Sequence, residues 1–440
     1  MVKANGNDNG RRIVYVVDGA RTPFLKAKTK PGPFTAADLA VAVCKPLLLR
    51  QPFKPTELDE VITGCMMPAP SEANISRVIS LRLGCGKDVP AWTVQRNCAS
   101  GLQAIDNAYQ DIASGRHDLV LAGGTEAMSH APILFNQEMT GWLGQWFSAK
   151  TLSARLGLLP QIKVRYLKPI IALLQGLSDP LVGLSMGQTA ENTAYRFGIT
   201  REEMDAFAVQ SHQRLATAMD AGVMGEIEPL YDNQGSVYEA DDGLRRDSSV
   251  EKLAKLQPFF DKKWGMVTAA NSSQITDGAA YVILASEEAV KKHHLSVLAK
   301  IVDVEWAGLA PEQMGLGPVH AMTPILKRQG LSLKEIDTFE INEAFAAQVL
   351  GCVKAWQDET YCQDQLGLKE PLGRLPEDKL NIDGGAIALG HPIGASGARV
   401  LLHTVDILQR QQSRYGIAAL CIGGGQGGAM LVERVTEAKA

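Results

Sequence analysis

The sequence predicts an α/β protein made of two similar halves, and three observations support this. Short β-branched runs alternate with helical patterns, and glycines mark the connections between them. The triplet Ala99-Ser100-Gly101 opens a predicted helix that leads to a glycine-ended strand, and Ala395-Ser396-Gly397 opens a second helix at a similar distance from its strand. Segment 57–62 is echoed, in the same order along the chain, by segment 335–340. We therefore expect duplicated αβα halves, with a mostly parallel sheet covered by helices on both faces.

Length and composition limit the class of protein. A chain of 440 residues is too long for one compact core, so two or three domains are expected. A net charge of −4 gives no reason to expect nucleic acid as a partner. The first ten residues are polar and lack the apolar core of a secretory signal, so we expect a cytoplasmic protein. The seven cysteines are odd in number and form no C-x-x-C pair, which argues against a disulfide framework and against a metal site.

The N-terminal half should comprise residues 1–128 together with 250–292. Its first strand is expected at 12–17, where a β-branched run is too short for a helix, and a turn should follow at 18–23. Hydrophobic spacing then predicts helices at 36–49 and 74–83, a helix that ends near Gly115, and strands at 60–64, 118–124 and 281–285.

Residues 129–249 lack clear strand alternation, so we expect them to form an inserted loop domain. Helical patterns occupy 187–197 and 202–221, and the second begins with the capping sequence Thr200-Arg-Glu-Glu. The C-terminal half, 293–440, should contain a helix at 400–409 and strands at 417–424 and 429–433.

Cys98 stands out as a candidate nucleophile. Segment 93–105 predicts a strand end, a tight turn at Asn97 and Cys98, and then a helix. Unpaired N–H groups and the helix dipole at a helix N-terminus favour the reactive thiolate of cysteine. A lone cysteine is more often a small buried hydrophobe, so Cys98 needs companions to carry this argument.

The second half offers such companions. His391 precedes a proline suited to a first helical turn and is a candidate general base. Cys421 ends a run that otherwise predicts a core strand, and Asn342 could cap a helix or orient a water. The run 423–428 fits G-x-G-x-x-G, but only twelve residues follow and they predict a strand, so we reject dinucleotide binding. Its glycines would instead let backbone N–H groups approach a ligand.

Segment 140–178 contains five basic residues and no Asp or Glu, among aromatic and aliphatic side chains. A basic amphipathic stretch of this kind can lie on an anionic membrane surface or dock on a partner. A lid over a phosphate-bearing ligand and ordinary packing are the alternatives. No run reaches the ~20 apolar residues that span a bilayer.

Seven motifs resemble those of the thiolases, in the family's order and over nearly the whole chain. They are Arg21-Thr-Pro23, Asn97-Cys-Ala-Ser-Gly101, Ala122-Gly-Gly-Thr-Glu-Ala-Met-Ser129, Asn271-Ser-Ser273 with Asp277-Gly-Ala-Ala280, Asn342-Glu-Ala-Phe-Ala346, Gly390-His-Pro-Ile-Gly394 and Cys421-Ile-Gly423. The resemblance implies a five-layered αβαβα fold with an inserted loop domain. It also implies acyl exchange between coenzyme A (CoA) and a 3-ketoacyl chain.

The resemblance assigns roles to five residues. Cys98 would accept the acyl group, and His391 would activate it. Cys421 would move a proton at the α-carbon of the second thioester. Asn342 would hold a water that binds one thioester oxygen together with His391, and the N–H groups of Cys98 and Gly423 would form the second oxyanion site.

CoA and acyl-CoA would be substrates, with no permanently bound cofactor. Positions that match CoA- or acyl-contacting residues of the family are Ser273, Arg245, Met186, Phe260, Ala344 and Phe345. Short-chain biosynthetic thiolases carry histidine before Met-Gly, whereas this chain has Ser185-Met186-Gly187. The long aromatic insert is similar to that of trifunctional-complex β-subunits, although these usually have histidine at the position of Asn342.

The sequence therefore favours a degradative 3-ketoacyl-CoA thiolase. An acetyl-CoA acetyltransferase and a chiefly structural partner of an oxidising α-subunit are the alternatives. The expected assembly is a homodimer or homotetramer, with a hydratase/dehydrogenase α-subunit as a further candidate partner and peripheral membrane contact through 140–178.

Overall fold

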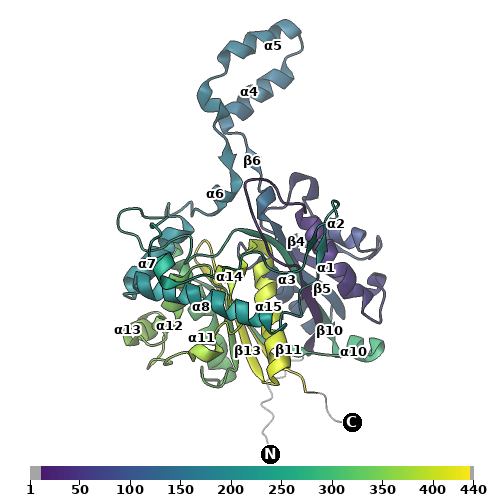
Figure 1. The fold of residues 1–440 in the computed structure, drawn as a ribbon. Helices are drawn as coiled ribbons and strands as arrows, with labels where there is room; N and C mark the ends of the chain where they lie inside the picture. The colour runs from purple at the N-terminus through teal and green to yellow at the C-terminus, as the bar shows by residue number, and fades with distance from the viewer. Residues whose placement is uncertain (1–10, 437–440) are drawn as a thin grey trace, which may run out of the picture.

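The structure, a computed structural model, describes residues 11–436 (Figure 1). The polar N-terminal segment discussed above lies outside the described residues. The first half begins with β1 (Val14–Arg21), β2 (Leu25–Lys26), α1 (Ala36–Leu49), β3 (Glu60–Gly64), α2 (Ile75–Arg82), β4 (Ala91–Val94), α3 (Ser100–Ala113) and β5 (Leu119–Ala127), and ends with β10 (Thr276–Ser286) and α10 (Glu287–His293). The second half contains β11 (Ala299–Gly308), α11 (Gly317–Gln329), β12 (Thr338–Ile341), α12 (Ala346–Ala355), α13 (Glu359–Asp364), α14 (Ala386–Leu389), α15 (Ile393–Gln411), β13 (Tyr415–Ile422) and β14 (Gln426–Arg434).

The segment between β5 and β10 is mainly helical. It contains β6 (Ile133–Leu134), α4 (Gln137–Ser148), α5 (Leu152–Leu158), β7 (Ile170–Ile171), α6 (Ala172–Gly176), α7 (Met186–Arg196), α8 (Arg201–Asp220), β8 (Leu230–Tyr231), β9 (Val237–Tyr238) and α9 (Val250–Leu253). The predicted capping sequence starts α8, where the side chains of Thr200 and Glu203 cap each other's backbone N–H groups. The predicted limits of the inserted domain stay a prediction.

The main sheet is mixed, so the prediction of a mostly parallel sheet was wrong. Its order is β12-β13-β14-β11-β1-β10-β5-β3-β4, and the halves meet where β1 and β11 pair through Tyr15↔Lys300 and Val16↔Ala299. Only β3 with β4, β3 with β5, and β12 with β13 are parallel among the described strands of this path. These pairs are joined by helical crossovers, whereas the tight turn between β13 and β14 allows only an antiparallel pair.

Four strands, β1, β5, β10 and β14, are longer than predicted. β1 continues to Arg21 through the expected turn, with a bulge between Val16 and Asp18. β5 continues past Gly124 to Ala127, because β10 offers paired backbone as far as Asp277.

The duplication is visible in the topology. In the first half β4-β3-β5-β10-β1 follow one another across the sheet, and β12-β13-β14-β11 repeat the last four positions in the second half. An isolated parallel bridge between Phe339 and Leu380 places the chain at Leu380 beside β12. This position corresponds to that of β4, which lies beside β3 in the first half. The echoed segments 57–62 and 335–340 lead into β3 and β12.

Helices α3 and α15 pack against each other between the two halves of the sheet, and the repeated Ala-Ser-Gly triplets explain how closely. A Cβ on Gly101 would lie 2.7 Å from the carbonyl oxygen of Gly394, and a Cβ on Gly397 would lie 2.5 Å from the amide nitrogen of Leu102. Glycine is therefore required where the helices meet. Because Cys98 precedes α3 and His391 precedes α15, this contact brings the two candidate residues to the same end of a helix pair.

The core follows this layered arrangement. A central cluster joins α3 and α15 to both halves of the sheet. A second cluster packs α1 and α2 on the outer face of the first half, and a third packs α11, α12 and α13 on the outer face of the second. The order of layers is α, β, α, β, α, as expected.

An arm, defined as residues 133–175, projects from this body and carries α4 and α5 (Figure 1). Its neck is the two-stranded pair Ile133↔Ile171 and Leu134↔Ile170. Among residues 11–436, no helix is both long enough and apolar enough to cross a membrane.

Candidate active site

Cys98 lies in a turn that the second half holds in place. Asn97 adopts a left-handed backbone conformation with φ 44°, which asparagine tolerates better than most residues. Its side-chain Nδ2 donates a 2.8 Å hydrogen bond to the carbonyl oxygen of Gly423. The half-buried Cys98 and Gly423 line one cavity of about 240 Å³. The predicted nucleophile and oxyanion glycine are thus brought together from opposite ends of the chain.

His391 is buried at the start of α15, where its hydrogen bonds determine which ring nitrogen carries the proton. Its Nδ1 lies 2.6 Å from Ser396 Oγ, and Ser396 Oγ donates its one proton to the carbonyl oxygen of Pro392 at 3.0 Å. Ser396 must then accept from Nδ1–H, so Nε2 is the unprotonated nitrogen. Within residues 11–436, Nε2 has no hydrogen-bond partner. The imidazole can therefore accept a proton at Nε2.

Burial makes this base neutral. It lowers the pKa of His391 from 6.5 to about 4, with a smaller contribution from the positive charge of Arg399. Sequence reasoning used Ser396 only as part of a repeat, yet its hydroxyl is the group that sets the histidine tautomer. Its place five residues after the histidine, one helical turn into α15, was the available signal.

Asn342 directly follows β12 and is fully buried against the imidazole. Its Nδ2 is 3.5 Å from His391 Nδ1, which is a contact and not a hydrogen bond because both nitrogens carry protons in this tautomer. Its backbone N–H donates to the carbonyl oxygen of Ala419 on β13 at 2.9 Å. In the described chain, its Oδ1 accepts no hydrogen bond. A buried amide oxygen without a partner is costly, so this oxygen can hold a water or a substrate donor.

Cys421 lies at the end of β13 with its side chain buried. Burial raises its pKa well above the usual range, and the neighbouring Cys98 raises it further. Burial also raises the pKa of Cys98, although the Gly423 N–H acts in the opposite direction. The N–H groups around Cys98 therefore favour its thiolate, as expected for a helix N-terminus, but burial is the larger effect. Both thiols are protonated at rest, and Cys98 needs a base.

A larger cavity of about 360 Å³ adjoins the one at Cys98. The two share the lining residues Leu177, Ser178, Met186 and Ile393, so they adjoin, and together they are called the cleft. His391 lies on the wall of the larger cavity, whose other lining residues are mainly apolar. An acyl chain in this cleft would reach both candidate catalytic groups.

The predicted substrate-contacting residues separate into two groups. Met186, Phe260, Ser273 and Phe345 line the larger cavity, and the ring of Phe260 packs edge-on against Phe345 at 5.9 Å. Arg245 and Ala344 do not line either cavity. Arg245 is exposed, and Ala344 accepts a 2.9 Å hydrogen bond from the Ser273 N–H, which positions that residue.

Two buried glutamates fasten the site and had no assigned role in the sequence. Glu126 accepts hydrogen bonds from the N–H groups of Met66, Met67 and Gly394 at 2.9 to 3.0 Å, so it ties a loop of the first half to the start of α15. Glu343 accepts from Ser211, Asn381 and the Ile387 N–H, and holds the loop that follows Asn342. Each lies beside or within a quoted motif, which was the signal available.

Family models cover nearly all of this architecture. The model described as "Thiolase, N-terminal domain" matches residues 14–288, and the one described as "Thiolase, C-terminal domain" matches residues 295–434. The chain belongs to the thiolase family.

Relatives of this thiolase match along most of their length. The mitochondrial trifunctional enzyme subunit beta of Bos taurus is 37% identical, over 96% of this chain and 88% of its own. The 3-ketoacyl-CoA thiolase of Photobacterium profundum is also 37% identical, over 96% and 97%. The human mitochondrial 3-ketoacyl-CoA thiolase is 39% identical, over 96% and 98%.

Solved structures show the same fold. The human mitochondrial 3-ketoacyl-CoA thiolase in complex with CoA has a TM-score of 0.81 at 38% identity, covering 97% of this chain and 98% of its own. An acetyl-CoA acetyltransferase from Syntrophomonas wolfei has a TM-score of 0.84 at 35% identity, covering 97% and 100%.

The low pKa of His391 predicts the pH dependence of the acylation step in this thiolase. Nε2 stays unprotonated down to about pH 4, so the single-turnover rate of Cys98 acylation by acetyl-CoA should not decline between pH 7 and pH 5. Histidine in the unfolded chain binds its proton near pH 6.5, so this residue destabilises the fold as pH falls from 6.5 towards 4. Circular dichroism at each pH separates the two effects. A loss of rate centred near pH 6.5 in folded protein would contradict the assignment.

Proposed function

We propose that this thiolase cleaves 3-ketoacyl-CoA with free CoA, giving acetyl-CoA and a shortened acyl-CoA in fatty-acid β-oxidation. The observation that carries the proposal is the apolar cavity walled by Met186, Phe260 and Phe345, which adjoins the cavity at Cys98. It offers an acyl chain a place next to the nucleophile. Two of the relatives above are named 3-ketoacyl-CoA thiolases, which supports the same reading.

In the first step, His391 Nε2 accepts the Cys98 thiol proton, and the sulfur attacks the 3-keto carbon. The bond between C2 and C3 then breaks. Its electron pair leaves as the enolate of acetyl-CoA, and the acyl group remains on Cys98. The protonated Cys421 thiol supplies a proton to C2 of the enolate, which completes acetyl-CoA. The high pKa of Cys421 suits this role, because the group is protonated before the bond breaks.

In the second step, free CoA resolves the acyl-enzyme. The CoA thiol gives its proton to the Cys421 thiolate that the first step leaves, and its sulfur attacks the acyl carbon. The bond from that carbon to Cys98 breaks, and the Cys98 thiolate takes back the proton held on His391 Nε2. The N–H groups of Cys98 and Gly423 would bind the oxyanion, and loss of one such donor typically costs on the order of 10² to 10³ in rate. Both reactant and product are thioesters, so the acyl transfer itself is nearly balanced in energy.

The phosphates of CoA would bind beside the cleft at a basic group of Lys26, Lys28 and Arg245. Burial lowers the pKa of Lys26, and the positive charges of Arg245 and Lys28 lower it further, while the carboxylate of Asp242 acts in the opposite direction. Asp242 also lies 3.9 Å from Lys28 Nζ, so it neutralises part of this group. Gln274, on the cavity wall, donates to the carbonyl oxygen of Gly243, two residues before Arg245 in the chain, at 2.8 Å. Clustered cations of this kind attract phosphate.

Chain-length preference tests the proposal. We expect kcat/KM for thiolysis to rise from acetoacetyl-CoA to 3-ketoacyl-CoA with ten to sixteen carbons, because each added methylene enters the apolar cleft. Each buried methylene contributes roughly 0.8 kcal/mol, so a gain of at least tenfold is expected. The measurement is initial rates on purified protein. A preference for acetoacetyl-CoA would instead assign an acetyl-CoA acetyltransferase that works in the condensing direction.

The bovine relative is by its name a subunit of a larger enzyme, which supports a further proposal that this chain assembles with an α-subunit. A homodimer or homotetramer of this chain remains the expected core assembly. Turnover by the isolated chain would separate an enzyme from a chiefly structural partner, since a structural partner would show no intrinsic thiolysis.

A further inference from the structure

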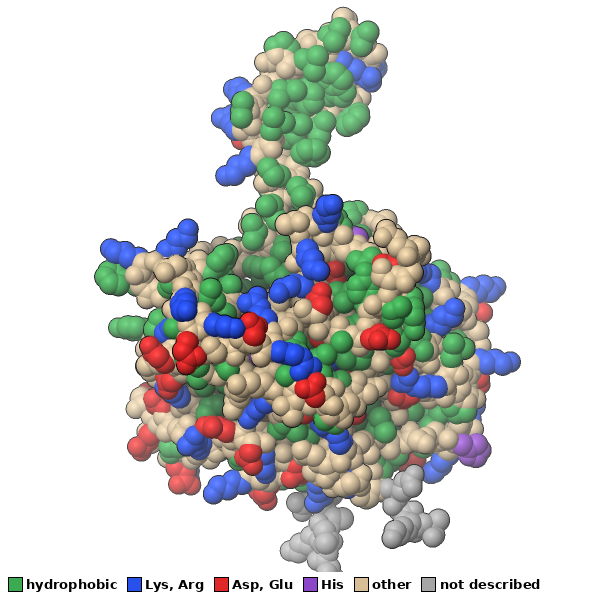
Figure 2. Space-filling model, in the orientation of Figure 1, with side chains coloured by type: hydrophobic (Ala, Val, Ile, Leu, Met, Phe, Trp, Pro, Cys, Tyr) green, Lys and Arg blue, Asp and Glu red, His purple; other side chains and the backbone are tan. Residues whose placement is uncertain are grey.

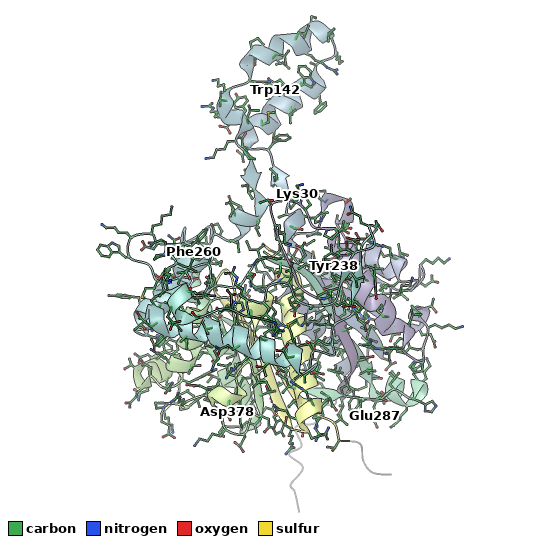
Figure 3. The ribbon with its side chains drawn as sticks, in the orientation of Figure 1. Lys30, Trp142, Tyr238, Phe260, Glu287 and Asp378 are labelled. Carbon is green, nitrogen blue, oxygen red and sulfur yellow. The ribbon has the colours of Figure 1, made fainter. Side chains whose placement is uncertain are left out.

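The arm exposes apolar side chains that the body of the protein does not cover. No residue from 131 to 178 is buried. Phe147 is 75% exposed and Val164 is 87% exposed. Figure 2 shows hydrophobic side chains gathered over the arm, and Figure 3 places Trp142 far from Phe260 in the body. The arm is therefore not a lid folded over the cleft, which was one of the alternatives.

The arm nevertheless has internal contacts that give it a defined shape. The rings of Trp142 and Trp146 stack with centroids 5.4 Å apart, and Trp142 Nε1 donates to the Leu158 carbonyl oxygen at 2.9 Å. Asn136 Nδ2 donates to the carbonyl oxygens of Arg165 and Lys168 at 2.9 and 3.0 Å, which closes the base of the helical hairpin. The exposed apolar residues thus sit on an ordered element.

The charge of the arm selects one class of occupant. It carries five basic residues and a single acidic one, Glu138, in a chain whose net charge is −4. Glu138 pairs with Arg165, and the described structure gives Lys150, Lys163 and Lys168 no ion-pair partner. An arm from a second copy would bring like charge to this surface. An anionic bilayer would satisfy the cations and accept the apolar side chains at once.

The base of the arm belongs to the active-site cleft. After β7, helix α6 continues directly into the cavity walls, where Leu174 and Leu177 line the larger cavity and Gln175 and Gly176 line the one at Cys98. A surface bound to the arm would therefore lie on the side of the molecule where the cleft is built.

We propose that the arm docks this protein on an anionic membrane surface, with Phe147, Leu152, Leu156 and Val164 entering the interface and the lysines contacting lipid phosphates. The arm is interfacial and does not span the bilayer. Docking concerns the arm alone, so it stands or falls separately from the proposed thiolysis.

Flotation of the full chain with vesicles tests the proposal. The wild-type protein should float with phosphatidylcholine vesicles that contain phosphatidylglycerol, and should remain at the bottom with phosphatidylcholine alone. Phe147→Ser/Leu152→Ser and Lys150→Glu/Lys163→Glu should each weaken binding at least about tenfold. Leu49→Ser, at a residue 76% exposed on the body, and Lys87→Glu are the matched controls and should float normally.

Thiolysis of acetoacetyl-CoA without vesicles should be equal in all variants, which shows that they fold. The proposal is overturned if the wild-type protein stays at the bottom with anionic vesicles. It is also overturned if the wild type floats equally well with neutral vesicles, or if the arm variants float as well as the wild type does. Light scattering tests the alternative that the arm is an interface between copies. That alternative holds if the arm variants change the molecular mass and the wild-type protein does not float.

Discussion

Cys98→Ala should abolish acyl-enzyme formation and lower thiolysis by at least about 10⁴-fold. The Cys98 sulfur faces the cavity that it lines together with Gly423, whose N–H acts on it, and alanine leaves a small gap at a half-buried position. The check combines the intact mass of the protein after incubation with acetyl-CoA and steady-state thiolysis. No mass increase and residual turnover near background are expected.

Cys85→Ala is the matched control, because Cys85 is a buried thiol in the outer core of the first half. It should acylate at Cys98 and turn over as the wild type does. Normal thiolysis by Cys98→Ala, with the same protein still gaining an acyl mass elsewhere, would show that another residue is the nucleophile.

Cys421→Ala should separate the two halves of the reaction. Acylation of Cys98 by acetyl-CoA should continue near the wild-type rate, because the proton of Cys98 goes to His391. Thiolysis should fall by about 10³-fold, in the range that loss of a general acid or base produces. Exchange of the α-protons of acetyl-CoA with deuterated water, followed by mass spectrometry, reports on Cys421 alone.

Cys352→Ala controls for the loss of a buried thiol near Cys421, whose pKa it also influences. It should retain α-proton exchange. If Cys421→Ala exchanged α-protons at the wild-type rate, the acid/base role would belong to another group, and His391 would be the next residue to test.

The local structure followed closely from local patterns. The helix at 36–49 and the strand at 60–64 are observed with the predicted bounds, and Thr200 caps α8 as expected. These elements depend on hydrophobic period and capping, which are properties of neighbouring residues. The mixed sheet was not predicted, because strand direction depends on which distant strand lies alongside. The antiparallel pairing of β5 with β10 spans the whole inserted segment.

The candidate residues were also found from motifs, but their electrostatic states were not. The helix N-terminus was expected to favour the thiolate of Cys98, and its N–H groups do lower the pKa, but the larger effect of burial raises it. The unprotonated Nε2 of His391 depends on Ser396 and Pro392, whose hydroxyl and carbonyl come into place only when α15 forms.

By itself, the sequence determined the duplicated αβα plan, the choice of candidate catalytic side chains and the basic character of the arm, because these are carried by residue type and spacing. Tertiary structure alone decided that the two thiols are protonated, that the histidine is a neutral base and that the arm stands away from the body. Burial of the thiols and of the imidazole depends on contacts between segments hundreds of residues apart, and the histidine tautomer depends on the formation of α15. Residue type and spacing do not contain that information.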